Sequence, residues 1–287
     1  MSRFSAKNSI FAPIQSIYTP LSRYSSPIRV RHGRVFLILN MLVKSKGIVL
    51  NRRKYSDTSL IVKVFTRQCG VISFIVKNAF SKNSRFSQAH FAPMNLLELT
   101  FHHKNNTSLQ YIKELSFYRH YENIPFDLAK NTILLFYNEL LYRLLFDYGA
   151  DERLYDFIEH ELIGLDACEK PRPDTHIIFM ATLARELGFL PNNNLSELTP
   201  YFAVDDGCFT SFPHSKEEGL DREASRYLSA ILTAVSEGGT QNDNATPPKA
   251  IRNNVLDILV IYFEHHNEQL HGLHSVEMFR KLSEMIN

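Results

Sequence analysis

Two short segments in the first half of the chain are rich in positive charge, and the second of them also holds the aromatic residues Phe80 and Phe86. Their cations are Arg52, Arg53, Lys54, Lys77, Lys82 and Arg85. Cationic side chains track phosphates and aromatic faces let bases stack, which is how many proteins bind single-stranded nucleic acid with little sequence preference. We expect these cations to contact phosphates and Phe86 to stack on a base. Phe80 and Phe86 are equally suited to plug the mouth of a barrel.

Charge is divided unevenly along the chain. Residues 41–120 hold 13 basic and three acidic residues, a net charge of +10, whereas residues 121–287 hold 13 basic and 27 acidic residues, a net charge of −14. The whole-chain charge of +2 therefore conceals a basic segment that can attract polyanions. This asymmetry favours nucleic acid as the partner of residues 41–120.

The basic segment has the pattern of a small β-barrel. Short β-branched or alternating apolar runs, separated by turn residues, predict strands over 46–50, 60–65, 71–77, 97–101 and 109–117. No stretch between these strands predicts a helix long enough for a crossover between parallel strands. We predict a five-stranded Greek-key barrel of the OB type, with an SH3-like barrel as the alternative.

After Pro125 the apolar residues recur with helical spacing. This pattern, with capping Asp residues, predicts helices over 127–148, 151–163, 174–188, 220–236, 251–266 and 275–285. The stretch 200–213 predicts a β-hairpin, whose two adjacent Asp residues lack the further ligands of a calcium loop. The polar stretch 237–249 predicts a flexible loop. The expected fold class is α+β, with an N-terminal five-stranded OB-fold barrel over 41–120 and an all-α helical bundle over 121–287.

Residues 1–40 differ in composition, because they are Ser-rich and basic and contain no acidic residue. They fit an organelle transit peptide, a disordered basic arm, or a stretch upstream of a true start at Met41. We favour the last interpretation and expect them to be dispensable. The apolar run 35–39 is far shorter than the roughly 20 residues that a membrane span needs, so we expect a soluble protein without membrane contact.

Motifs of the common enzyme classes are missing from the sequence. It contains no Gly-rich phosphate loop, nucleophile elbow or H-E-x-x-H motif, so we expect no catalytic residues. Three scattered cysteines fit free thiols in a reducing compartment. The best metal candidates are His265, His266, His271 and His274, but histidines at a solvated helix end are the commoner arrangement. We expect neither a metal nor a cofactor.

A series of short motifs follows a distinctive order along residues 41–285. In the predicted barrel these are Lys46-Gly47-Ile48-Val49-Leu50, Tyr55-Ser56-Asp57-Thr58, Phe65-Thr66-Arg67, Gly70, Ser84-Arg85-Phe86, Pro93, Leu96-Leu97-Glu98-Leu99 and Ile112-Lys113-Glu114. In the predicted bundle they are Leu187-Gly188-Phe189-Leu190-Pro191, the hairpin at 201–210 and Tyr262-Phe263-Glu264-His265-His266 through Ser275. Their order and spacing resemble the RecO family of bacterial DNA repair and recombination mediators.

The resemblance implies a non-enzymatic protein of the bacterial cytoplasm, associated with the nucleoid. Such a protein binds single- and double-stranded DNA and anneals complementary strands. With its partner RecR it assists loading of the RecA recombinase onto DNA coated by single-strand-binding protein (SSB). The alternatives from other classes are a nonspecific RNA-binding OB-fold protein and an interaction adaptor without DNA activity.

The chain departs from the family pattern at two places. Many members carry a four-cysteine zinc finger near the third helix, whereas only Cys168 and Cys208 lie in that region here. We therefore expect no zinc, with the hairpin in the place of the finger. The family often has Gly and Arg after the lysine that matches Lys77, where this chain has Asn78-Ala79-Phe80.

Overall fold

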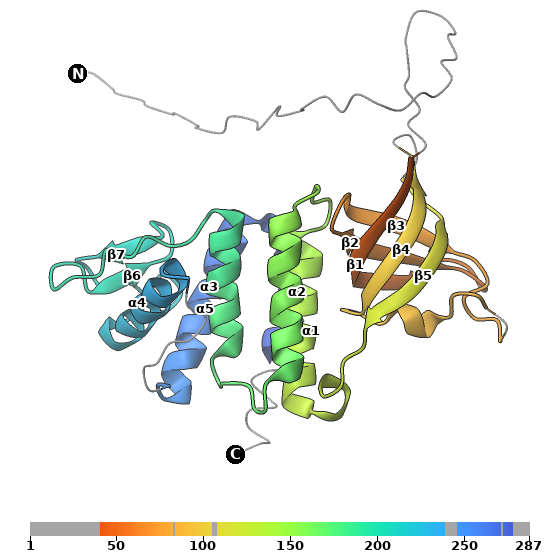
Figure 1. Ribbon diagram of the computed structural model, residues 1–287. Helices are drawn as coiled ribbons and strands as arrows, with labels where there is room; N and C mark the ends of the chain where they lie inside the picture. Colours follow the sequence, from red (N-terminus) through yellow and green to blue (C-terminus); the bar gives the residue numbers. More distant parts are fainter. Residues whose placement is uncertain (1–40, 83, 105–107, 239–245, 271, 278–287) are drawn as a thin grey trace, which may run out of the picture. The chain divides into compact units, whose positions relative to one another are not determined.

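The computed structural model describes residues 41–277 apart from 83, 105–107, 239–245 and 271. In that part of the chain, a five-stranded antiparallel sheet is followed by helices and a two-stranded hairpin (Figure 1). The predicted α+β class is therefore confirmed. The expectations for residues 1–40, for the middle of the loop 237–249 and for the last helix beyond residue 277 fall outside the described residues.

Except for the first strand, which is much longer than expected, the strands lie close to their predicted positions. They are β1 (Met41–Lys54), β2 (Leu60–Thr66), β3 (Gly70–Val76), β4 (Leu96–His103), β5 (Ile112–Arg119), β6 (Tyr201–Ala203) and β7 (Cys208–Thr210). The helices are α1 (Leu128–Leu144), α2 (Glu152–Ala167), α3 (Thr175–Leu187), α4 (Arg222–Ser236) and α5 (Lys249–His266). Short 3-10 helices span η1 (Gln88–Phe91), η2 (Ile124–Phe126) and η3 (Glu268–Leu270).

The large sheet has the strand order β3-β2-β1-β4-β5. Its two edges meet at Gln110, just before β5. The Gln110 N–H donates to the Ser73 carbonyl at 2.9 Å, and its carbonyl accepts the Ile75 N–H at 3.0 Å. This parallel bridge to β3 gives the connectivity of an OB-type barrel. The barrel interior is filled by side chains such as Val62, Phe74 and Phe101.

Strand β1 is much longer than the predicted 46–50, because it pairs with two neighbours. Its first half pairs with β4 and its second half continues along β2, where Arg53 lies opposite Ile61. The two stretches overlap at Gly47 and Ile48, and a bulge near Leu50 interrupts the pairing of β1 with β2. The run Arg52-Arg53-Lys54, predicted to follow the strand, is therefore its last part. The alternation of apolar residues does not predict this last part of the strand, because its residues are charged and exposed.

Three of the helices begin at aspartate caps. Asp127, Asp151 and Asp221 each accept the backbone N–H three residues later, at 2.9 Å. Asp174 precedes α3 as predicted but makes no such cap bond. Its carboxylate instead accepts from Arg172 and from the Tyr227 hydroxyl. Asp174, which the sequence predicts to cap α3, thus links α3 to α4.

The helices and one end of the barrel's outer face share a hydrophobic cluster, whereas the barrel interior forms a cluster of its own. Ile48, Leu50 and Phe65 of the barrel belong to the same buried cluster as residues of α1, α2 and α3, and the Phe65 ring lies 5.7 Å from that of Tyr155. Around this contact, Arg67 binds both carboxylate oxygens of Asp156 at 2.7 and 2.8 Å. The barrel therefore packs on the helices through one end of the outer face of β1 and β2.

Within the described part of the chain, no helix is both long and apolar enough to cross a membrane.

Candidate nucleic-acid interface

The other half of the β1–β2–β3 outer face carries polar and charged side chains. Lys63 lies between Asn51 on β1 and Ser73 on β3, and in the neighbouring row Arg53 lies opposite Ile61. Side chains alternate along a strand, and the intervening Val62 belongs to the barrel interior. These residues therefore point outward.

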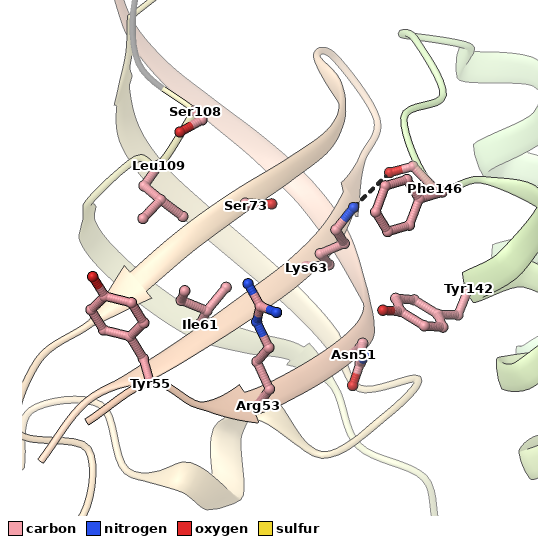
Figure 2. Close-up of a pocket in the computed structure, with 10 residues that line it drawn as sticks. All are labelled: Asn51, Arg53, Tyr55, Ile61, Lys63, Ser73, Ser108, Leu109, Tyr142 and Phe146. Atoms are coloured by element: carbon pink, nitrogen blue, oxygen red, sulfur yellow. Dashed lines mark hydrogen bonds between the residues drawn. The ribbon is translucent and has the colours of Figure 1, made fainter. Parts of the chain in front are cut away.

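A cavity of about 360 Å³, hereafter the barrel groove, lies over these strands (Figure 2). Its lining combines two cations with aromatic, apolar and small polar side chains. The residues are Asn51, Arg53, Tyr55, Ile61, Lys63, Ser73, Ser108, Leu109, Tyr142 and Phe146. They come from β1, β2 and β3, from the β1–β2 and β4–β5 connections, and from the end of α1. In OB-folds, this face and these two loops are where oligonucleotides bind.

Lys63 stands at the boundary between the barrel groove and the helices. Its Nζ donates to the Phe146 carbonyl at 2.8 Å and lies 3.1 Å from the Phe146 ring centroid, with Asp147 Oδ1 at 3.8 Å. Burial lowers the pKa of Lys63 below its ordinary value, and the neighbouring Arg53 acts in the same direction against the attraction of Asp147. Lys63 is thus a positioned cation that ties β2 to the end of α1.

Of the seven predicted site residues, Arg53 lines the barrel groove. Arg52 donates to the Gln88 carbonyl, and Lys54 pairs with Asp57 at 3.0 Å. Lys77 follows β3 and lies 5.5 Å from the centroid of the Tyr111 ring. Lys77 is therefore a cation beside an exposed aromatic ring, the pairing that single-strand binders use.

The remaining three predicted residues belong to the loop 77–87. Lys82 and Arg85 are exposed, and the Arg85 guanidinium lies 5.1 Å from the Phe86 ring centroid. Phe86 is half-buried against the barrel interior, whereas 42% of Phe80 is exposed. Asn78 has φ +55°, in the left-handed region that Gly and Asn tolerate best. Asn78 therefore supplies a left-handed turn at the start of this loop.

Sequence reasoning missed Tyr55, Lys63, Tyr111 and Tyr142. Tyr55 directly follows the basic run, and Lys63 is the one charged residue within the apolar strand β2, so both carried a signal. Tyr142 lies on a helix beyond residue 120 and reaches the groove through tertiary packing alone.

The charge of the barrel is partly neutralised by the helices. Besides the Arg67–Asp156 pair, Lys46 binds Glu159 at 2.8 Å and Arg67 also binds Glu152 at 2.6 Å. The net charge of +10 therefore overstates what is available to a polyanion. Some acidic side chains of residues 121–287 thus form ion pairs that attach the barrel to the helices.

Neither the cysteines nor the histidine cluster forms a metal site in the part of the chain that the structure describes. No group of three or more His, Cys, Asp or Glu side chains there is arranged to hold a metal ion.

Comparison with known families agrees with this architecture. Residues 41–121 match the family described as Recombination protein O N terminal, and residues 125–272 match Recombination protein O C terminal. The chain belongs to the RecO family. The two matches meet between β5 and α1, where the sheet gives way to helices.

RecO family members from several bacteria align with most of the chain. The DNA repair protein RecO of Flavobacterium psychrophilum is 30% identical over 243 residues, covering 84% of this chain and 99% of that protein. The protein of the same name from Bacteroides fragilis is 36% identical over 171 residues, covering 60% of this chain and 71% of the relative. That from Flavobacterium johnsoniae is 34% identical over 193 residues, with 67% and 80% covered.

Proposed function

We propose that this protein acts in DNA repair and recombination by binding single-stranded DNA on the barrel and annealing complementary strands. The observation that carries the proposal is the barrel groove, which combines Arg53 and Lys63 with aromatic walls on the OB-fold face where oligonucleotides bind. The exposed Lys82 and Arg85 of the loop 77–87 add further positive charge to the barrel surface. Membership of the RecO family supports the same role.

Annealing by this route requires no covalent chemistry. Two complementary strands repel each other through their phosphates, and a basic surface that releases counterions from both lowers that repulsion. Stacking of unpaired bases on exposed aromatic rings keeps the strands extended and available for pairing. The protein is therefore proposed to be non-enzymatic and to bind duplex DNA through phosphates alone. In the cell it would assist RecA loading onto SSB-coated DNA together with RecR, in the cytoplasm near the nucleoid.

The test measures annealing of complementary fluorescent oligonucleotides by the full chain, without nucleotide or metal and with or without SSB. The variant Lys82→Glu/Arg85→Glu is compared with Lys216→Glu, which reverses an exposed charge beyond the barrel. The double variant should anneal more slowly and bind all sequences more weakly. Its salt dependence for single strands should flatten by about 0.7 per lost phosphate contact.

Two results would contradict the proposal. One is an annealing rate that the double variant leaves unchanged while circular dichroism shows an intact fold. The other is tighter binding of RNA than of DNA of the same sequence, which would favour an RNA-binding protein.

A further inference from the structure

The barrel groove is built from surfaces of different chemistry. Figure 2 shows Tyr55 and Tyr142 on opposite sides of the groove, with Arg53 and Lys63 between them. Ile61 contributes an apolar surface between them. Planar heteroaromatic ligands need both a ring or apolar surface for their faces and polar groups for their edges.

The polar groups in the groove are held in place by the fold. Asn51, Lys63 and Ser73 are cross-strand neighbours on three adjacent strands. The Lys63 ammonium is fixed by the Phe146 carbonyl and ring, so its position does not depend on a ligand. A carbonyl oxygen at the edge of a base would meet a preplaced N–H donor there, while Arg53 offers charge to the adjoining phosphate.

We propose that the barrel groove receives one unpaired nucleobase and thereby selects single-stranded over double-stranded DNA, an inference that rests on the proposed function. Its volume of about 360 Å³ lies within the range of roughly 300–1,000 Å³ for ligand pockets, so it has room for a planar base. A base within a duplex must first be unstacked and unpaired before it enters such a site. Duplex DNA therefore reaches the phosphate contacts but not the groove.

Tyr55 is the side chain through which this inference can be tested. It lies in the β1–β2 connection and is 60% exposed, so its removal leaves the barrel interior intact. The probes are a short oligothymidylate and an abasic phosphodiester of equal length, which keeps the phosphates but lacks bases. Affinities of the full chain for both are measured by fluorescence anisotropy at one salt concentration.

Tyr55→Ala should weaken oligothymidylate binding about 5- to 150-fold, the range expected for loss of one stacked base, and leave abasic binding unchanged. Tyr55→Phe should restore the affinity because it keeps the ring. Phe212→Ala, which removes an aromatic ring that is 73% exposed near the β6–β7 hairpin, should change neither affinity.

The outcomes separate this inference from the proposed function. If Tyr55→Ala lowers both affinities equally, or neither, the base subsite is wrong. The proposed function still stands in that case if Lys82→Glu/Arg85→Glu weakens both probes. If the unaltered chain binds neither probe, both the subsite and the proposed function are overturned.

Discussion

Asp166 is a single buried carboxylate that organises the connection between sheet and helices. Its oxygens accept the backbone N–H groups of Glu122, Asn123 and Ile124, each at 2.9 Å. Burial alone would raise the pKa of Asp166, but these donors, together with the charge of Lys130, outweigh it and hold the pKa below its ordinary value. The charged form is therefore the one that the fold stabilises.

Replacing Asp166 by Asn should destabilise the protein by about 1–3 kcal/mol at pH 7, because the amide satisfies fewer of the buried donors. A lowered pKa in the folded state means that the stabilisation is complete above the unfolded value of about 3.9 and disappears as pH falls through the folded value. The difference between the two proteins should therefore shrink at about pH 3 in urea unfolding. Asp206→Asn, at an exposed hairpin position, is the matched control. A difference that does not vary with pH would contradict this account.

At the scale of elements, the β2–β3 turn is fitted closely to the loop between α1 and α2. Gly70 has φ +71°, and a Cβ atom there would lie 2.4 Å from the Gly149 carbonyl carbon and 2.5 Å from the Tyr148 carbonyl oxygen. The neighbouring Val71 N–H donates to that same oxygen at 2.9 Å. Both backbone conformation and space therefore require glycine at position 70.

Gly70→Ala should lower the melting temperature in a thermal unfolding scan, because the turn must move away from the helices. The control is Gly164→Ala on α2, where the added Cβ would meet nothing within 4 Å apart from its own stretch of helix. That change should be neutral or stabilising by up to about 1 kcal/mol, since Ala favours the helix. Equal melting temperatures for the two variants would show that the close approach is not maintained in solution.

Elements whose signals are local were predictable from the sequence. The alternation through Leu60, Val62 and Val64 indicated β2, and Asp151 correctly marked the start of α2. The last part of β1 was not predictable, because Arg52, Arg53 and Lys54 face solvent and break the apolar pattern. Only part of the barrel groove could be predicted from the sequence. Arg53 lies within the basic run, but Phe146 meets Lys63 through packing between residues far apart in sequence.

For the whole molecule, the hydrophobic cluster shared by the barrel face and the helices should prevent the barrel from folding stably when it is expressed alone. Ile48, Leu50 and Phe65 are almost fully buried, and all three belong to the cluster that contains the helix residues. Excised residues 41–120 would expose these side chains, each worth about 1.5–3 kcal/mol when buried.

The fragment 41–120 should therefore aggregate or lose a cooperative thermal transition, whereas the chain 41–287 should unfold like the full chain. Circular dichroism melting together with light scattering measures both properties. A fragment 41–120 that stays monomeric and melts cooperatively would mean that the barrel does not depend on the helices. A change in the melting of 41–287 would show instead that residues 1–40 are not dispensable.

Lys63 has two roles, because it lines the barrel groove and also attaches β2 to Phe146 after α1. In a scan of all single substitutions, changes at Lys63, Tyr142 and Phe146 should be damaging in two selections. One selects for folded protein and the other for function. Tyr55, which is exposed and lies in a loop, should score in the second selection alone. Selection for a better DNA site is thereby limited on the α1 side, so that heritable variation in binding should accumulate at the β1–β2 connection.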